Sequence, residues 1–316
     1  MQDLFIQQDF FAQGGTWAAG DNVYGQLGNN SVAVTYTIAS ANTMLNWKQI
    51  SMGSGSTAAI KTDGTLWTWG NNANGQCGLG DIVPRSSPVQ VGSLTNWKQT
   101  TGGLLSSAAV KTDGTAWAWG NNIAFVGNLG LGDTIPRSSP VQIGALTNWK
   151  QVACGYQVSG GIKTNGTLWT WGATGAGQSG HDNLVNYSSP VQVGTLTNWK
   201  QLAVGGNSML AVKTDGTLWA WGGNAYGITG LSDTVSRSSP VQVGSLTNWK
   251  RVDNGYSHTI ALKTDGTLWT WGYNGYGPLG IGGAVSYSSP IQVGVQANWG
   301  QFSAGFNTTI AIQNNF

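Results

Sequence analysis

The sequence contains no glutamate, and charged side chains are sparse along all 316 residues. Fourteen Lys and Arg face twelve Asp, which leaves a formal net charge of +2. A chain of this charge has no basic field with which to attract nucleic acid or an anionic membrane surface. We therefore expect no nucleic-acid partner.

Cysteine and long apolar runs are equally scarce. The two cysteines, Cys77 and Cys154, stand where sibling segments carry apolar residues, so we interpret them as small buried hydrophobic residues and expect no disulfide between them. No run approaches 18 apolar residues, and Met1–Asp9 has neither a basic region nor an apolar core. These absences predict no cleaved signal peptide, no membrane insertion and synthesis in the cytoplasm.

Glycine and tryptophan, by contrast, are abundant, at 49 and 17 positions. The segment Lys61–Gly70 reads K-T-D-G-T-L-W-T-W-G, and near copies end at Gly120, Gly172, Gly222 and Gly272. A worn copy opens the chain at Gly14–Gly20. A second marker, Asn-Trp, recurs at Trp47, Trp97, Trp149, Trp199, Trp249 and Trp299. A repeat of about 50 residues that runs from end to end predicts one array of stacked units rather than separate domains.

Each unit has the alternation of β-strands. Asp63-Gly64 predicts a two-residue type I′ hairpin turn, which would place Ile60 opposite Trp67 and Ala58 opposite Trp69. One face of such a sheet carries large side chains and the other carries small ones. Stacking the large face of one unit on the small face of the next buries both, which is the packing of a β-propeller.

The terminal segments together make one further unit. Residues 299–316 carry the first 18 positions of a repeat, and residues 15–46 carry the other 32. We therefore predict an all-β, six-bladed β-propeller, closed by pairing of the N- and C-terminal strands in one blade. The expected boundaries are one domain over 1–316, an N-terminal extension over 1–14, and blades at about 47–96, 97–148, 149–198, 199–248, 249–298, and 299–316 plus 15–46. In this last blade, Ala19 replaces the second Trp.

The segments Gly255–Gly266 and Leu268–Gly272 carry the closest match to a known repeat. They read G-Y-S-H-T-I-A-L-K-T-D-G and L-W-T-W-G, and this order resembles the repeats of the regulator of chromosome condensation family of β-propellers. The resemblance covers nearly the whole chain. It implies a propeller without implying one activity, because members include a nucleotide exchange factor, a plant photoreceptor, bacterial β-lactamase inhibitor proteins, and viral and bacterial proteins.

No catalytic or metal constellation is convincing. His258 lies near Asp253 and Ser257 in sequence, but residues adjacent on a strand point to alternate faces, so we favour a structural role. His181-Asp182 offers too few donors for a metal. One Asp per blade suits capping of a turn better than calcium binding. These candidates are Asp81, Asp133, Asp182 and Asp233. We expect an enzyme activity, a cofactor and a metal to be absent.

Two sets of lysines recur once per blade, beginning at Lys48 and at Lys61. Either set could attract a polyanion. The second set has an Asp two residues further on in four of its five copies, so we expect solvated hairpin ends.

The positions that differ between copies indicate where a partner could bind. One set follows the glycine after the first strand of each unit, and a second follows the W-x-W-G segment. Exposed aromatic residues and amides on loops of a rigid scaffold are typical of a protein-binding surface. Drift at unconstrained loop positions is the alternative. The candidate binding residues are Tyr24, Leu104, Leu105, Phe125, Tyr156, Gln157, Asn207, Tyr226, Tyr256, His258, Tyr276, Phe306 and Asn307.

The function that these patterns favour is a non-enzymatic binding or structural propeller that docks a protein or glycan through its variable loops. The low charge and near-identical repeats resemble viral and bacterial members of the family, so we expect a virion or adhesin component within a larger assembly. The alternatives are a regulator of a GTPase or a chromatin-associated factor, and a protein inhibitor of an enzyme.

Overall fold

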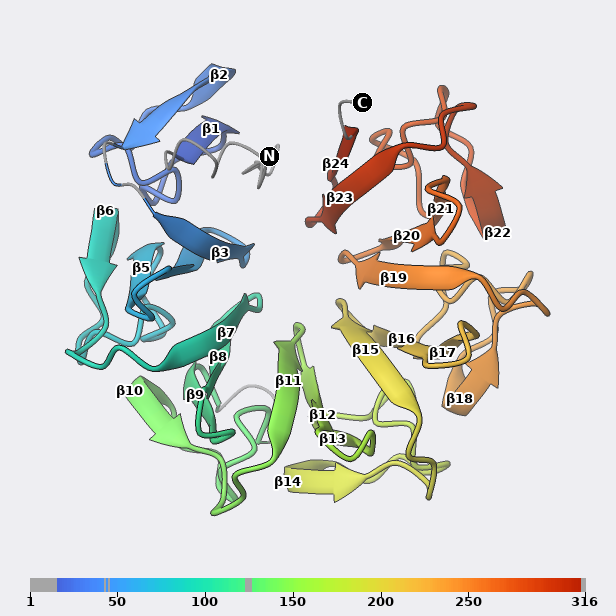
Figure 1. Cartoon of the computed structure of the whole chain (residues 1–316), viewed down its shortest axis with the longest axis horizontal. Helices are drawn as coiled ribbons and strands as arrows, with labels where there is room; N and C mark the ends of the chain where they lie inside the picture. The colour runs from blue at the N-terminus through green and yellow to red at the C-terminus, as the bar shows by residue number, and fades with distance from the viewer. Residues whose placement is uncertain (1–15, 43, 45, 123–126, 314–316) are drawn as a thin grey trace. The chain divides into compact units, whose positions relative to one another are not determined.

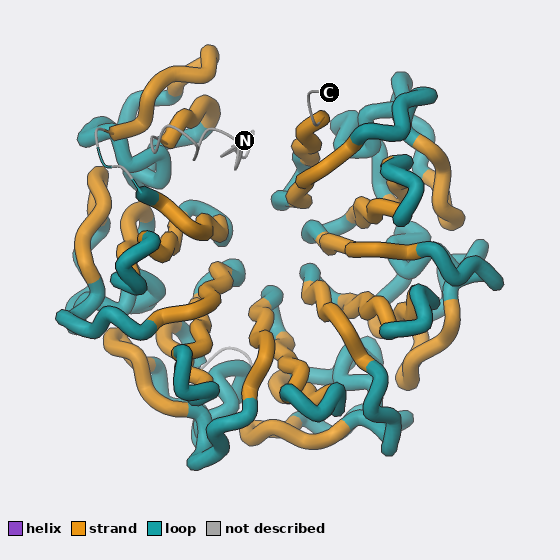
Figure 2. Tube along the Cα trace, in the orientation of Figure 1, coloured by secondary structure: helices purple, strands orange, loops and turns teal. Residues whose placement is uncertain are grey.

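The computed structural model describes residues 16–42, 44, 46–122 and 127–313. Its regular elements are all β-strands, and Figure 2 shows only strands and loops along the described chain. In this described part, no helix is long and apolar enough to span a membrane. The all-β prediction is confirmed for these residues.

The chain divides into two compact units, Met1–Cys154 and Gly155–Phe316. The first contains a two-stranded sheet and two four-stranded sheets, and then a single strand (Figure 1). Its strands are β1 (Thr16–Gly20), β2 (Thr35–Asn42), β3 (Trp47–Met52), β4 (Ser56–Lys61), β5 (Leu66–Gly70), β6 (Arg85–Gln90), β7 (Trp97–Gly102), β8 (Ser106–Lys111), β9 (Ala116–Gly120), β10 (Arg137–Gln142) and β11 (Trp149–Cys154).

The second unit begins with the hydrogen-bonded strands β12, β13 and β14, continues with two four-stranded sheets, and ends in a two-stranded sheet. Its strands are β12 (Val158–Lys163), β13 (Leu168–Gly172), β14 (Tyr187–Gln192), β15 (Trp199–Val204), β16 (Ser208–Lys213), β17 (Leu218–Gly222), β18 (Arg237–Gln242), β19 (Trp249–Asn254), β20 (His258–Lys263), β21 (Leu268–Gly272), β22 (Tyr287–Gln292), β23 (Trp299–Ala304) and β24 (Thr309–Gln313). Every complete sheet is an antiparallel meander in chain order.

The predicted hairpin turn is wrong by one residue. Lys61 N donates to Thr65 O and Gly64 N donates to Lys61 O, both at 3.0 Å, so the loop has three residues. Gly64 alone in this loop has a positive φ, of 81°, as in a type I turn followed by a left-handed glycine. The register therefore shifts, and Ala59 lies opposite Trp67 while Ile60 lies opposite Leu66.

This shift changes which residues share a face of the sheet. Trp67 and Trp69 lie with Thr57 and Ala59 on one face, and the aliphatic side chains lie on the other. The aliphatic face then packs on the tryptophan face of the next sheet. In the first unit this core contains Ile60, Leu66, Val91, Trp97, Ala109 and Trp119. In the second unit, Leu210, Val212, Leu218 and Val243 pack against Trp249, Ala261 and Trp271. The stacking that we predicted is present, with corrected partners.

Glutamine side chains join the first strands of neighbouring sheets. Gln201 Nε2 donates to Val252 O at 2.9 Å, and Val252 N donates to Gln201 Oε1 at 3.0 Å. Gln49 makes the same pair of bonds with Thr100, and Gln99 with Val152. Each amide thus supplies the two bonds that a neighbouring peptide group would supply, and it fixes the spacing of adjacent first strands, such as β15 and β19 (Figure 1).

Candidate binding surface

The two sets of variable loops lie at the same end of each sheet. The turn after the first strand and the loop after the third strand are joined by one backbone bond, for example from Tyr273 N to Ser257 O at 2.9 Å. Gly223 N donates in the same way to Asn207 O. We call this end of a sheet the variable end. The opposite end, with the Asp-Gly turn, is called the hairpin end.

Glycines allow the variable ends of neighbouring sheets to approach closely. Tyr256 N donates to Gly305 O, and Gly206 N to Gly255 O, each at 3.3 Å. A Cβ atom on Gly205 or Gly255 would lie 2.4 Å from the carbonyl oxygen of the next glycine in this series. Since real Cβ atoms do not approach an oxygen so closely, these turns need glycine, and the residues that follow them are brought together.

Three predicted binding residues form a cluster in the second unit. The rings of Tyr256 and Phe306 are stacked, with centroids 4.2 Å apart, and Tyr156 meets Tyr256 edge-on at 6.1 Å. Gly206 is the equivalent residue of the intervening repeat. A Cβ atom there would come within 2.9 Å of the Tyr256 ring. Tyr256 is 37% exposed, and the other two rings are half-buried. We call Tyr156, Tyr256 and Phe306 the inner aromatic cluster.

A second cluster lies on the loops that follow the third strands. Tyr226 and Tyr273 have ring centroids 5.0 Å apart, and Tyr273 and Tyr276 are 5.9 Å apart. Tyr226 is 52% exposed and Tyr276 is 76% exposed. Sequence reasoning missed Tyr273, although its place directly after a W-x-W-G segment was a usable signal. We call these three tyrosines the outer aromatic cluster.

The remaining candidates have varied environments. Asn207 is exposed, and Gln157 and Asn307 are half-buried at the same variable ends. In the first unit Tyr24 is exposed and its ring lies beside Gly55, whereas Leu104 and Leu105 are half-buried. Phe125 lies outside the described residues.

His258 differs from the other candidates because its side chain is fully buried. Its Nε2 lies 2.8 Å from Thr309 Oγ1, which joins β20 to β24. Burial lowers the pKa of His258 to about 4, so the imidazole is neutral at physiological pH. The ring links two strands and is not part of the exposed surface.

The groups that could suggest catalysis have structural contacts. Asp253 Oδ2 accepts bonds from Ala304 N at 2.9 Å and Ser303 Oγ at 3.1 Å, and Ser257 is buried. Burial raises the pKa of the Cys77 thiol to about 12, so its thiolate is suppressed, and Cys154 is buried too, as predicted for both. Within the described ranges, no three His, Cys or Asp side chains gather as a metal-binding group.

The loop aspartates cap turns, as predicted, with one exception. Val83 N donates to Asp81 Oδ1 at 3.0 Å, and Arg85 pairs with the same carboxylate at 2.6 Å. Asp133 and Asp233 make equivalent contacts. In the second unit, however, Asn183 takes this capping position. Asp182 precedes it in a left-handed conformation, with a φ of 58°, and accepts from Ser238 Oγ instead.

The prediction of solvated lysines is wrong for four of the five lysines in the set that begins at Lys61, since only Lys61 itself is half-buried and the others are buried. Lys213 is buried, and its Nζ lies 3.6 Å from the ring centroid of Trp219 and 4.8 Å from that of Trp199. Lys111 and Lys263 lie over tryptophan pairs in the same way, and burial lowers the pKa of all three ammonium groups. These charges are held inside the packing by cation–π contacts. The set that begins at Lys48 is exposed at the hairpin end.

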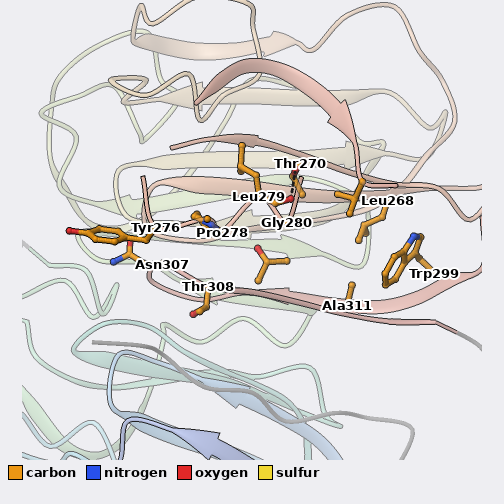
Figure 3. Close-up of a pocket in the computed structure, with 13 residues that line it drawn as sticks. Leu268, Thr270, Tyr276, Pro278, Leu279, Gly280, Trp299, Asn307, Thr308 and Ala311 are labelled. Atoms are coloured by element: carbon orange, nitrogen blue, oxygen red, sulfur yellow. Dashed lines mark hydrogen bonds between the residues drawn. The ribbon is translucent and has the colours of Figure 1, made fainter. Parts of the chain in front are cut away.

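A cavity of about 310 Å³ opens beside the outer aromatic cluster. Its wall includes Leu268, Trp299 and Ala311 toward one end and the candidate residues Tyr276 and Asn307 toward the other (Figure 3). Gly277–Gly280 forms a further side. The cavity lies wholly within the second unit, between the β19–β22 sheet and the β23–β24 sheet.

Comparison with known proteins agrees with this fold. The sequence profile of the RCC1-like domain matches residues 17–315. No curated protein sequence matches the chain significantly. Human WBSCR16 superimposes with a TM-score of 0.84 at 23% identity, over 96% of this chain and 82% of that chain.

The yeast protein Prp20p is similar to the chain in two solved structures. The Saccharomyces cerevisiae structure, described with binding to Gsp1p and histones, gives a TM-score of 0.81 at 18% identity, over 96% of this chain and 79% of that chain. Yeast RCC1 (Prp20) bound to Kap60 gives 0.84 at 18% identity, over 99% and 79%. At these identities the likeness concerns the fold.

Proposed function

Because this chain belongs to the RCC1-like domain family, we propose that it is a non-enzymatic module that binds a protein partner through the variable ends of its sheets. The observation that carries this proposal is the gathering of exposed and half-exposed aromatic rings there. The inner aromatic cluster joins loops from repeats that are 50 and 100 residues apart, and the outer cluster lies on the adjacent loops. Tyrosines held by a rigid scaffold bury large area at low entropic cost.

We also propose that the six repeats close into one six-bladed propeller over residues 1–316. In this arrangement β1 and β2 complete the blade that β23 and β24 begin, so that residues 15–46 and 299–316 form one blade and residues 1–14 remain as an extension. The two-stranded sheets at each end of the chain support this proposal, since every complete sheet has four strands. Truncation after Asn307 should abolish cooperative unfolding of the whole chain, and one sharp transition in the truncated protein would contradict closure.

A protein is the partner that the surface favours, with a glycan as the alternative. The setting that we propose is a surface component of a larger assembly, of the virion or adhesin type. Sparse charge and near-identical repeats support this setting. Such a chain repeats one backbone scaffold around its loops and has few charges to steer a charged partner electrostatically. A second candidate, regulation of a GTPase or of chromatin, takes its support from the similarity of fold to Prp20p, which binds Gsp1p and histones.

The test compares two variants of the full chain. Replacing Tyr256 and Phe306 with serine removes the inner cluster, whereas Leu246→Ser changes an exposed apolar residue at the hairpin end and serves as the control. Crosslinking to a host extract, followed by mass spectrometry, should recover partner proteins with wild type and with the control but not with the double variant. Equal recovery by all three proteins would contradict the proposal.

Parallel assays separate the alternatives. Binding on a glycan array that depends on the same rings would favour a glycan partner. Accelerated nucleotide release from a GTPase by the purified chain would favour the regulator, and dose-dependent loss of activity of a captured enzyme would favour an inhibitor.

A further inference from the structure

At four places in the described part of the chain, a carbonyl group receives the indole N–H of a tryptophan from the neighbouring repeat. The second Trp of the W-x-W segment is the donor each time, and its Nε1 lies 2.8 to 3.0 Å from the acceptor. The donors are Trp69, Trp119, Trp221 and Trp271, and their acceptors are the carbonyl oxygens of Gln26, Gln76, Gln178 and Ile228. The repeat therefore contains a standard groove for an indole ring.

The glycine two residues after the acceptor forms the floor of this groove. In the second unit, a Cβ on Gly230 would lie 2.8 Å from Trp271 Nε1, and a Cβ on Gly180 would lie 2.8 Å from Trp221 Nε1. The glycine is thus in close contact with the ring, and a larger residue would displace it.

The last groove of the second unit is built from the same positions but is lined differently. Pro278 and Gly280 stand where Ile228 and Gly230 stand one repeat earlier, and a Cβ on Gly280 would meet no atom within 4 Å. The cavity of about 310 Å³ occupies this place, with Leu268, Val293 and Trp299 in its wall. This volume is at the lower limit of ligand pockets, and apolar cavities of smaller size bind single aromatic rings.

The described side chains around this groove differ from those between the previous two sheets. Between the previous two sheets, Trp271 packs with Leu218 and Val243. Among the described side chains of the cluster that follows, Leu268, Val293 and Phe302 pack with Trp299 and Ala311. The strand that the proposed closure would add carries Trp17 at the position of the first W-x-W Trp, but it has Ala19 at the position of the second, which is the Trp that donates to the neighbouring carbonyl in the other repeats.

We propose that this groove binds the indole side chain of a tryptophan from the protein partner, whose N–H donates to the carbonyl oxygen of Pro278. Two residues of the variable end, Tyr276 and Asn307, line the cavity, which makes the groove continuous with the aromatic surface (Figure 3). The inference rests on the proposed function, and it specifies the chemistry of the partner at one point of that surface.

The experiment follows the ¹⁹F resonance of N-acetyl-5-fluorotryptophanamide on addition of the full chain. Saturable binding is expected with wild type. The analogue methylated at the indole nitrogen should bind about three to ten times more weakly, because it lacks the donor. Absence of saturable binding to wild type would overturn the inference, and so would binding of 5-fluoroindole alone without binding of the amide.

Two substitutions test the location of the site. Ala311→Phe places a ring in the cavity from within the second unit and should abolish binding. Ala19→Trp supplies the missing indole and should also abolish it, whereas Ala297→Trp adds an indole at an exposed position and should leave it unchanged. Unchanged binding to a folded Ala311→Phe protein would overturn the inference.

These variants also separate the groove from closure of the ring. If Ala19→Trp raises the melting temperature and wild type binds no probe, closure is supported and the indole site is overturned. If Ala311→Phe blocks the probe and Ala19→Trp changes neither binding nor melting, the site stands and closure by β1 at this groove fails.

Discussion

The two ends of each sheet are built under different constraints. At the hairpin end, the Asp carboxylate accepts bonds from the N–H and hydroxyl of the Thr two residues later, and this Thr accepts the indole N–H of the first W-x-W tryptophan. Copies of that chain of bonds recur almost unchanged. At the variable end the glycines, the backbone bonds and an Asn cap in the loop after the third strand recur, as in the bond from Thr229 N to Asn224 Oδ1, whereas the side chains of the two variable sets differ. Residues are thus repeated where neighbouring sheets need them, and they vary where the neighbour is solvent.

Loss of a buried W-x-W tryptophan that packs between neighbouring sheets should have the largest effect on stability. Trp221 is fully buried and donates to Gln178 O, so Trp221→Ala leaves a cavity and an unpaired carbonyl. We expect the free energy of unfolding to fall by about 3 to 5 kcal/mol, measured by urea denaturation. Tyr226→Ala, in the exposed loop that follows, is the matched aromatic control. A similar loss of unfolding free energy in both variants would contradict the distinction between the buried tryptophans that hold the sheets together and the exposed loop residues.

Acid should destabilise the protein through His258, the buried member of the variable end. Its pKa is about 4 in the folded chain against about 6.5 unfolded, so below pH 6.5 the unfolded state binds more protons. Stability is therefore complete above pH 6.5 and falls by roughly 3 kcal/mol as the pH drops to 4. His258→Asn should flatten the stability profile in this window. A profile of unchanged slope would show that another group titrates there.

A methyl group at the hairpin turn should cost less than either of these changes. Gly216 has a φ of 78°, and its Cβ would lie 2.0 Å from Thr247 O of the adjoining loop. We expect Gly216→Ala to lower the free energy of unfolding by about 2 kcal/mol. Gly244→Ala is an informative control, because Gly244 has a φ of 60° but no atom within 4 Å of its Cβ. Equal losses of unfolding free energy in the two variants would mean that the positive φ alone causes the effect, and not the contact with Thr247 O.

The buried lysine should contribute a smaller amount. Lys213→Met keeps the apolar stem over Trp199 and Trp219 but removes the ammonium group. A loss of about 1 kcal/mol is expected from the cation–π contact. Lys200→Met, at an exposed position on the same sheet, provides the comparison under identical urea conditions. Equal stability of wild type and Lys213→Met would mean that packing of the stem alone holds this lysine.

The smallest effect is expected at the most exposed ring. Tyr276 is 76% exposed, so Tyr276→Ser should change the free energy of unfolding by less than about 0.5 kcal/mol. Partner recovery in the crosslinking assay should nevertheless fall. A large loss of stability would indicate that Tyr276 contributes to packing between the sheets and is not a surface binding residue.

The hairpin shows how far the sequence can be taken. Periodicity and the Asp-Gly pair, which is Asn-Gly at residues 165–166, located the turns, but they predicted a two-residue turn where three residues form it. Both kinds of turn place a glycine in the left-handed region, so glycine alone does not distinguish them. The signal that does is Thr65, whose N–H and hydroxyl donate to Asp63 Oδ1. An equivalent Thr follows the Asp-Gly pair in the other copies, or Asn165-Gly166 in one of them.

The candidate site was predictable in position and less so in composition. Comparison of the copies identified Tyr156, Tyr256 and Phe306, because loops at equivalent positions differ there. It could not separate His258 from the exposed Tyr256, since burial begins at Ser257 and depends on where the strand begins. The lysines at the ends of the second strands lie on the tryptophan face in the observed register. The predicted two-residue turn shifted this register by one residue, so their burial was not predicted.

The glycine turns at the variable end have an energetic consequence for recognition. The backbone bond from Tyr256 N to Gly305 O forms when the sheets stack, and it holds Tyr256 against Phe306 before any ligand arrives. Ordering flexible aromatic side chains commonly opposes association by about 0.5 to 1.5 kcal/mol each. Here that loss of freedom occurs during folding, so a partner would meet a preorganised surface whose geometry is set by residues that have no side chain.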